Sequence, residues 1–280
     1  MRRAVSNIAW TFEEASQAYA CLEMAGIDGL EIAPGILFAD CEDPLAPGAR
    51  RAVSARRHLA DFGLRPVSMQ APLFGVPDAH LFASVERRVL FRDAMLAAVR
   101  LSSDLDIGNI VLGAPKQRVR PEGMASADAD ALASEVIREV ADEGAKNGVR
   151  IGVEVNPEAY GTNFLTTLGQ LAGFLEGPAD GAAAATLDLG AEILNDALET
   201  TPENVRRFET RLSHCHLSAP FLSGVPELMP EDLAPVWTAL DEIGFEGWVS
   251  LEMRRPDGGL SGLPEAIARF KALTGGRCAQ

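Results

Sequence analysis

The sequence has little positive charge for its size. Its 280 residues contain 25 Lys and Arg against 40 Asp and Glu, which gives a formal net charge of −15. Proteins that bind nucleic-acid backbones or anionic lipid need a basic face, so this balance argues against nucleic-acid and membrane-surface partners. A local basic pocket for one small anion is still compatible with it.

Long apolar runs are also absent. The longest, residues 107–114 and 181–187, fall far short of the roughly 20 residues that a membrane span requires. The apolar stretch after the two opening arginines is interrupted by Ser6 and Asn7 and soon meets acidic residues. We therefore expect neither a membrane segment nor a signal-peptide core.

Cysteine is scarce and shows no CxxC spacing. The four cysteines are Cys21, Cys41, Cys215 and Cys278. Four thiols in a chain of this length do not make a disulfide scaffold. We expect free thiols and a cytoplasmic protein.

One local unit recurs along the chain: a helix-like stretch ends at glycine and a β-rich run follows at once. It occupies residues 26–32, 63–69, 108–112, 148–154 and 244–252. Glycine just past a helix end supplies the left-handed residue that closes the last turn. Three less marked strands, Ala4–Trp10, Ala183–Leu189 and Arg211–Ser218, bring the number of predicted strands to eight.

Helix signals lie between these strands. Residues 11–14 have capping-box spacing before an apolar-periodic run, Thr201 is expected to cap a helix that has Pro202 in its first turn, and residues 126–147 are rich in Ala, Glu and Val. Eight βα units over 280 residues average 35 residues each, and their alternation predicts a parallel sheet. No Gly-rich phosphate fingerprint follows the first strand. We therefore predict a single (β/α)₈ TIM barrel domain over residues 1–280 rather than an open doubly wound sheet.

Alternation within the strands places carboxylates inside this barrel. In residues 149–156, four aliphatic side chains share one face, and Glu154 lies on the other. Asp188 and Glu252 have the same relation to the apolar residues of their own strands. Each acid comes at the C-terminal end of its strand, which is where barrel enzymes carry their chemistry.

Four strand-end residues form the candidate centre: Glu154, Asp188, His216 and Glu252. They come from the last four predicted strands, so their tips can converge. Three carboxylates packed together repel one another unless a cation joins them, and oxygen ligands with one imidazole suit Mn²⁺, Mg²⁺, Co²⁺ or Zn²⁺. The alternative is that each acid is satisfied separately, by a loop amide or an arginine.

The strand ends also carry a family pattern in order along nearly the whole chain. Its pieces are residues 6–10, 31–34, 68–70 with 73–75, 113–118, 154–157 with 160–164, 187–190, 214–218 and 249–253. In these pieces the chain resembles the sugar phosphate isomerase/epimerase group of the xylose isomerase-like TIM barrel superfamily. The resemblance implies one divalent metal ion, with Mn²⁺ preferred, held by Glu154, Asp188, His216 and Glu252. It also makes a homo-oligomer the usual state.

The chain departs from the ketose 3-epimerases of that superfamily. Those enzymes have a His where this chain has Ala191 and an Arg where it has Leu222, and an acidic residue often stands where it has Ala219. These differences put a simple ketohexose 3-epimerase in doubt but leave the implied metal ligands complete.

Six further residues are candidates for substrate binding: Gln70, Lys116, His214, Arg254, Glu31 and Trp10. Gln70 and Glu31 have the parity to line the pocket, and His214 shares the parity of His216. Basic side chains near the mouth, with Arg118 and Arg255 as weaker candidates, suit a phosphate or carboxylate on the substrate. The alternatives are a hydrogen-bonded core histidine, solvated charges, and a tryptophan that simply packs.

The expected function is a metal-dependent isomerase or epimerase of a sugar, keto-sugar or polyol derivative. Glu154 and Glu252 would remove and return a proton next to a metal-bound carbonyl, through an enediolate. The alternative is a lyase or dehydratase that uses the same site for β-elimination on a keto-cyclitol or 3-keto-glycoside. A repair endonuclease is disfavoured because it needs many His ligands and a basic surface, and a non-catalytic binding protein is disfavoured because the ligand set is intact.

Overall fold

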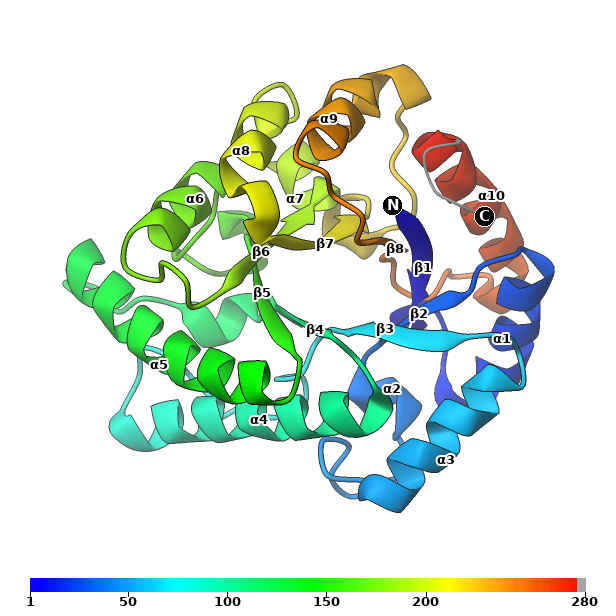
Figure 1. Ribbon diagram of the computed structural model, residues 1–280, viewed down its shortest axis with the longest axis horizontal. Helices are drawn as coiled ribbons and strands as arrows, with labels where there is room; N and C mark the ends of the chain where they lie inside the picture. Colours follow the sequence, from blue (N-terminus) through cyan, green and yellow to red (C-terminus); the bar gives the residue numbers. More distant parts are fainter. Residues whose placement is uncertain (276–280) are drawn as a thin grey trace.

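The computed structural model describes residues 1–275, and its centre is a closed barrel of parallel strands in the order β1 to β8 (Figure 1). The strands are β1 (Arg2–Ser6), β2 (Gly29–Ile32), β3 (Arg65–Met69), β4 (Asn109–Leu112), β5 (Arg150–Glu154), β6 (Ala184–Asp188), β7 (Leu212–Leu217) and β8 (Trp248–Leu251). Pairing of β1 with β8, which sets Arg2 opposite Trp248, closes the barrel. The predicted (β/α)₈ fold is confirmed.

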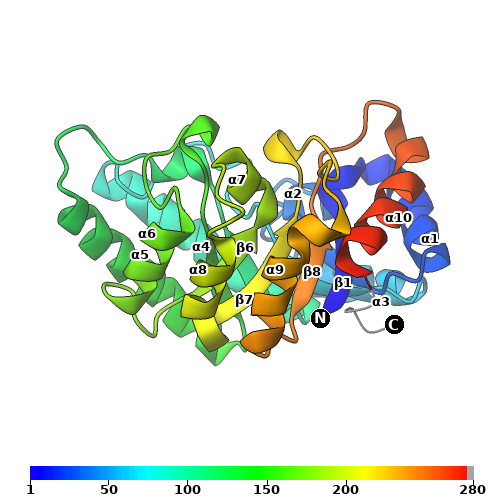
Figure 2. The same cartoon turned by 90° about the horizontal axis from the view of Figure 1, so that it is seen from above.

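Helices surround the barrel on its outer side (Figures 1 and 2). The α-helices are α1 (Ala15–Met24), α2 (Pro34–Leu37), α3 (Ala49–Ala60), α4 (Val85–Leu105), α5 (Ser126–Lys146), α6 (Leu168–Glu176), α7 (Leu189–Leu194), α8 (Thr201–Phe208), α9 (Pro230–Glu242) and α10 (Leu263–Thr274). Short 3₁₀ helices are η1 (Asn7–Ala9), η2 (Phe12–Glu14), η3 (Pro115–Arg118), η4 (Glu158–Tyr160), η5 (Glu209–Arg211), η6 (Pro220–Leu222) and η7 (Gly259–Gly262). The extent of the domain, residues 1–280, stays a prediction.

Alternation of side chains in the strands divides the core into two parts. The outward aliphatic residues of β5, such as Ile151 and Val153, belong to the large apolar core between strands and helices. Inside the barrel, a Cβ on Gly152 would stand 2.5 Å from Thr186 Oγ1 and 2.6 Å from Ser213 Oγ, so polar side chains fill this level. The predicted parity of β5 and β6 is therefore confirmed.

The first strand ends earlier than the predicted Ala4–Trp10. It stops at Ser6, whose side chain accepts a hydrogen bond from the Ile8 amide and starts the 3₁₀ helix η1. Asn7 then bonds both main-chain groups of Ala33, at 2.7 Å to its amide and 3.2 Å to its carbonyl. Polar side chains that bond the nearby backbone compete with a strand ladder, which explains the early end.

Thr201 does not act as the predicted helix cap. The residue before α8 is Thr200, and the Thr201 hydroxyl instead donates to Glu192 Oε2 at 2.8 Å. Glu192 lies in α7 and is 1 % exposed. The Thr201 hydroxyl therefore bonds a buried carboxyl group instead of capping the helix, because leaving a buried polar group without a hydrogen bond costs more free energy than leaving a helix end uncapped. The capping box of residues 11–14 is confirmed, with the Thr11 amide 3.0 Å from Glu14 Oε2.

Within residues 1–275, no helix combines the length and apolar character needed to cross a bilayer. Cys21 and Cys41 are free thiols, as expected. Cys278 lies outside the described residues. The cytoplasmic location stays a prediction.

Gly29 leaves room for the ring of Trp248, which packs with Ala4 and Val67 inside the N-terminal end of the barrel. A Cβ at this position would stand 2.5 Å from the Trp248 ring and 2.8 Å from the Arg3 carbonyl. We expect Gly29→Ala to lower the free energy of unfolding by about 1–3 kcal/mol, measured by urea denaturation. Gly173→Ala is the matched control, because no described atom outside the neighbouring backbone of its own helix lies within 4 Å of the added methyl group and helix propensity improves. Equal stability of the two variants would contradict the close packing.

Burial raises the pKa of Glu192 to about 7 from its ordinary 4.5, against the hydrogen bond from Thr201. Because the folded state holds this proton more tightly than the unfolded chain, stability should fall as pH rises from about 4.5 to 7. This difference in proton affinity should lower the free energy of unfolding by about 3 kcal/mol between these pH values. Glu192→Gln should abolish that loss and make the protein more stable at pH 8. Thermal unfolding across this pH range measures it. Glu203→Gln, at an exposed position of α8, should leave the pH profile as it is.

Candidate functional site

A cavity of about 340 Å³ opens at the C-terminal end of the strands. It is lined by Gln70, Ala71, Val111, Gly113, Ala114, Pro115, Glu154, Asn156, Tyr160, Asp188, Phe221, Leu222 and Glu252. Four of these, Ala71, Ala114, Phe221 and Leu222, have a left-handed backbone, out of eight such non-glycine residues in the described chain. Backbone strain of this kind gathers at functional sites, and its concentration here marks the cavity as one.

Three of the predicted site residues meet at the wall of this cavity. His216 Nδ1 lies 2.8 Å from Glu154 Oε1 and 3.2 Å from Glu252 Oε2. One ligand atom from each of the three side chains lies within 4.8 Å of the others. Glu154 ends β5, His216 lies near the end of β7, and Glu252 follows β8. The closing barrel therefore brings together residues that are far apart in the chain.

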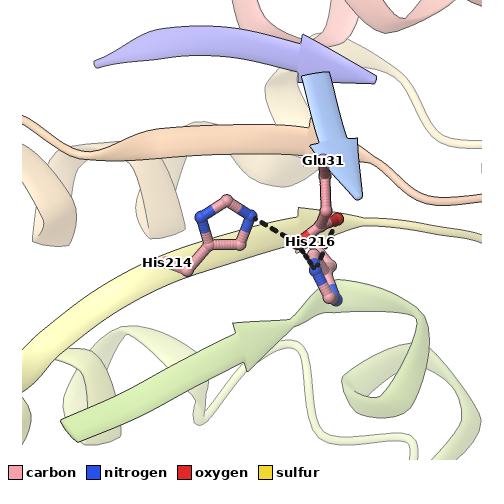
Figure 3. A group of neighbouring side chains, drawn as sticks. All are labelled: Glu31, His214 and His216. Carbon is pink, nitrogen blue, oxygen red and sulfur yellow. Dashed lines mark hydrogen bonds and ion pairs between the residues drawn. The ribbon is translucent and has the colours of Figure 1, made fainter. Parts of the chain in front are cut away.

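A third carboxylate, that of Glu31, lies on the other side of this imidazole. His216 Nε2 lies 3.1 Å from Glu31, and His214 Nε2 lies 3.2 Å from the same carboxylate (Figure 3). His214 also contacts Ser250 Oγ at 2.8 Å. A carboxylate on one ring nitrogen fixes the orientation and tautomer of an imidazole whose other nitrogen faces a ligand. Glu31 thus aims Nδ1 of His216 at Glu154 and Glu252.

The charges of this group shift one another strongly. Burial opposes the charged form of His216, but the negative charges of Glu252 and Glu31 outweigh it and raise its pKa well above the ordinary value. Burial also opposes the charge of Glu31, yet His216 and His214 hold the pKa of that carboxyl well below its usual range. For His214 burial wins, so its pKa is lowered. The surrounding acids therefore favour a protonated His216 when no metal ion is bound, and the ring would give up that proton to act as a metal ligand.

Asp188 lies across the same cavity but faces a different set of donors. Its carboxylate accepts hydrogen bonds from the amides of Gly190 and Ala191, at 3.0 and 3.2 Å, and from Ser218 Oγ at 2.6 Å. It therefore caps α7. Burial, with the charges of Glu154 and Glu252, raises the pKa of Asp188 to about 8. Among the described residues, Asp188 is not part of the close group around His216, and its role as a ligand stays a prediction.

The chemistry of this donor set fits a divalent cation. Within the described part of the chain, the residues that line the cavity include three carboxylates and no Lys, Arg or His. Burial raises the pKa of Glu252 despite the nearby His216, so the acids lack sufficient positive charge. Carboxylate oxygens with one imidazole are ligands that Mn²⁺, Mg²⁺, Co²⁺ and Zn²⁺ accept. Glu154, His216 and Glu252 are the residues best placed to hold such an ion.

A buried arginine supports Glu154 from behind. Arg118 is 1 % exposed, and its Nη2 donates to the Glu154 carbonyl at 2.9 Å and to Asn156 Oδ1 at 2.8 Å. Asn156 Nδ2 in turn donates to Glu154 Oε2 at 3.1 Å. Gly113 completes this arrangement, since a Cβ there would stand 2.6 Å from Glu154 Oε2. The Asn156 amide thus holds the Glu154 carboxylate, and the carboxylate fits at this place because residue 113 has no side chain.

The predicted substrate residues divide into three groups. Gln70 lines the cavity, while Glu31 and His214 lie beneath it, fully buried. Trp10 is 1 % exposed and packs edge-on against Tyr19, with ring centroids 6.2 Å apart. Lys116 and Arg254 are exposed and do not line the cavity. Of the weaker basic candidates, Arg118 is buried and Arg255 forms a bidentate pair with Glu14.

Sequence reasoning overlooked Tyr160 and Phe221. The Tyr160 hydroxyl accepts a hydrogen bond from the Phe221 amide at 2.9 Å, and the two rings meet edge to face 5.4 Å apart. Burial, with the nearby acids, raises the pKa of Tyr160 to about 12, so its hydroxyl keeps a proton to donate. The family segment 160–164 was a signal for Tyr160. Nothing in the sequence signalled Phe221, because its place depends on its own left-handed backbone and on a hydrogen bond to Tyr160, 61 residues earlier in the chain.

Comparison with known proteins gives a family match and structural neighbours. The sequence profile of the xylose isomerase-like TIM barrel family matches residues 19–273. A search of curated protein sequences found no match. A D-psicose 3-epimerase solved in the presence of D-fructose superimposes with a TM-score of 0.76 at 16 % identity, covering 98 % of this chain and 100 % of the other.

Two further structures show the range of proteins with this fold. A 3-keto-D-glucoside 4-epimerase from E. coli has a TM-score of 0.75 at 14 % identity, covering 97 % of this chain and 99 % of the other. An AP endonuclease of family 2 from Brucella melitensis has a TM-score of 0.71 at 20 % identity, with coverages of 96 % and 98 %. At these identities the likeness establishes the fold, and chemistry must be argued from the site. The resemblance inferred from the strand ends is confirmed.

Replacement of Arg118 tests the support behind Glu154. The lysine side chain is shorter and lacks the planar guanidinium group, so it would not place a nitrogen at the position of Nη2, and Arg118→Lys should lower the free energy of unfolding by about 1–3 kcal/mol. Urea denaturation measures this change. Arg255→Lys, in an exposed pair with Glu14, should leave the urea midpoint nearly unchanged. An unchanged midpoint in Arg118→Lys would show that the buried contacts contribute nothing.

Proposed function

Because the chain belongs to the xylose isomerase-like TIM barrel family and gathers an acid–imidazole centre at its strand ends, we propose that it is a divalent-metal-dependent isomerase or epimerase of a sugar, keto-sugar or polyol. One observation carries the proposal. Two buried carboxylates, Glu154 and Glu252, flank the same nitrogen of His216 at the wall of a cavity of about 340 Å³.

Glu154, His216 and Glu252 would hold the ion, with Asp188 as the proposed fourth ligand. A bound divalent cation supplies electrostatic stabilisation of negative charge on a substrate carbonyl oxygen and thereby acidifies the neighbouring carbon-bound proton. Mn²⁺ is the preferred ion. The close group of oxygen and nitrogen donors supports this assignment.

The protein's own groups move the proton. Glu154 and Glu252 belong to different strands, so one can remove a proton from a substrate carbon and the other can return one. The Asn156 amide that bonds Glu154 Oε2 holds the carboxylate in place for this transfer. Gln70 and Tyr160 line the same cavity and can hydrogen-bond substrate hydroxyls.

The lining favours an uncharged substrate end. It combines carboxylates, two amides and a phenol with the apolar side chains of Pro115, Phe221 and Leu222, and contains no cationic side chain. A phosphate at this depth would meet three carboxylates and, among the described residues, no cationic side chain, and DNA would meet the same carboxylates. We therefore propose a carbohydrate whose reacting part is neutral. A substrate phosphate held by Lys116 or Arg254 would have to lie outside the cavity.

The second candidate is β-elimination on a keto-cyclitol or 3-keto-glycoside. The Tyr160 hydroxyl supports it, since this group accepts from the Phe221 amide and retains its own proton for a leaving oxygen. Leu222 also lines the cavity where the ketose 3-epimerases of the resemblance carry Arg. Proton removal by a carboxylate is common to both reactions, and only the fate of the neighbouring group differs.

A screen of keto-sugars, polyols and 3-keto-glycosides against the purified protein tests the proposal. Isomerisation conserves the mass of the substrate, whereas elimination changes it, so mass spectrometry separates the two candidates. Removal of divalent ions with EDTA should abolish turnover, and Mn²⁺ should restore it. Turnover that persists in a protein shown by elemental analysis to lack metal would refute the proposed metal dependence.

Glu154→Gln should lower kcat by roughly 10²–10⁴-fold, because the amide cannot accept the substrate proton. Glu158→Gln is the matched control, since Glu158 is exposed in the same loop and does not line the cavity. Steady-state kinetics on the substrate found in the screen measures both variants, and circular dichroism checks their folding. Full turnover in a folded Glu154→Gln protein would assign the proton transfer to another group.

A further inference from the structure

A second cavity, of about 480 Å³, lies at the N-terminal end of the barrel strands, opposite the acidic one. Four arginines line it: Arg2, Arg65 and Arg150, which are the first residues of β1, β3 and β5, and Arg56 of α3. Among the described residues that line it, Asp106 is the one carboxylate. In a chain with a net charge of −15, this is a local concentration of positive charge.

Trp248 forms the floor of this cavity. The guanidinium carbons of Arg2 and Arg65 lie 4.3 and 4.8 Å from the centroid of its ring, which is almost fully buried. Stacking on an aromatic ring occupies the face of a guanidinium and leaves its N–H edge free to bond a ligand. The ring thus positions the guanidinium groups of Arg2 and Arg65 at the cavity and leaves their N–H groups available to a ligand.

Carboxylates balance only part of this charge. Arg65 pairs with Asp28 at 2.8 Å, and Arg56 lies 3.7 Å from Asp106. Within residues 1–275, Arg2 forms no ion pair, and Arg150 donates to the Thr210 carbonyl at 3.0 Å rather than to a carboxylate. Like charges that converge repel one another unless a counter-charge joins them. Just as the clustered acids at one end favour a bound cation, the clustered arginines at the other end favour a bound anion.

We propose that this cavity is a binding site for the phosphate group of a small molecule, separate from the catalytic end. Arginine forks match the paired oxygens of phosphate, and the volume suits a small phosphorylated compound. Near the catalytic mouth, Lys116 and Arg254 are exposed and do not line the acidic cavity, Arg118 is buried behind Glu154, and Arg255 is paired with Glu14. The site does not depend on the proposed catalytic function.

Titration calorimetry of the full chain with inorganic phosphate, in a low-salt buffer free of sulfate, tests the site. We expect one saturable site per chain, and Arg2→Gln and Arg150→Gln should each weaken binding at least tenfold. Arg57→Gln is the matched control, because Arg57 is exposed on the same helix as Arg56 and does not line the cavity. Glu154→Gln should bind phosphate as the unaltered protein does, which separates this site from the acidic cavity.

A second readout keeps the test independent of variant folding. Phosphate should change the emission of Trp248 in the unaltered protein, and chloride at equal ionic strength should not. A Trp248→Phe protein should lose this change in emission. Absence of saturable phosphate binding, or equal affinity in a folded Arg2→Gln protein, would overturn the proposal and leave the arginines a purely structural role at the strand starts.

Discussion

The catalytic end of this barrel depends on one imidazole held among carboxylates. His216 contacts Glu31 through Nε2 and both Glu154 and Glu252 through Nδ1, at distances of 2.8 to 3.2 Å. Buried acids this close repel one another, and a positive charge between them is the condition for packing them inside a fold. The rest of the site is built around that condition: Glu31 orients the ring from below, and Arg118 holds the strand end that carries Glu154.

The same electrostatic constraint organises the two ends of the barrel in opposite ways. Carboxylates collect where the strands end, and guanidinium groups collect where they begin. Between them lies an interior of small and polar side chains, with Trp248 filling the space that Gly29 leaves. Although the chain as a whole is acidic, negative and positive side chains are therefore separated along the barrel axis. A cation at one end and a phosphate at the other are the ligands that this polarity favours.

The sequence supported a prediction of most of the fold and the main members of the site. Residues that alternate along a strand face opposite ways in any sheet, so Glu154, Asp188 and Glu252 could be assigned to the barrel mouth from their strands alone. The error in β1 came from a local contact between Ser6 and the Ile8 amide, which ended the strand early. Thr201 failed as a cap because Glu192, nine residues earlier, competes for its hydroxyl. Both depend on side-chain partners that pattern alone does not specify.

By itself, then, the sequence determined the eight βα units, the parity of their strands and the acidic character of the strand ends, since these follow from short-range periodicity and charge. Only the tertiary structure decided which groups meet. His216 is 62 residues from Glu154 and 185 from Glu31, and Arg118 is 36 from Glu154. Barrel closure and the shift in register between strands set those contacts. For the same reason the arginines of β1, β3 and β5 became a cluster only in three dimensions.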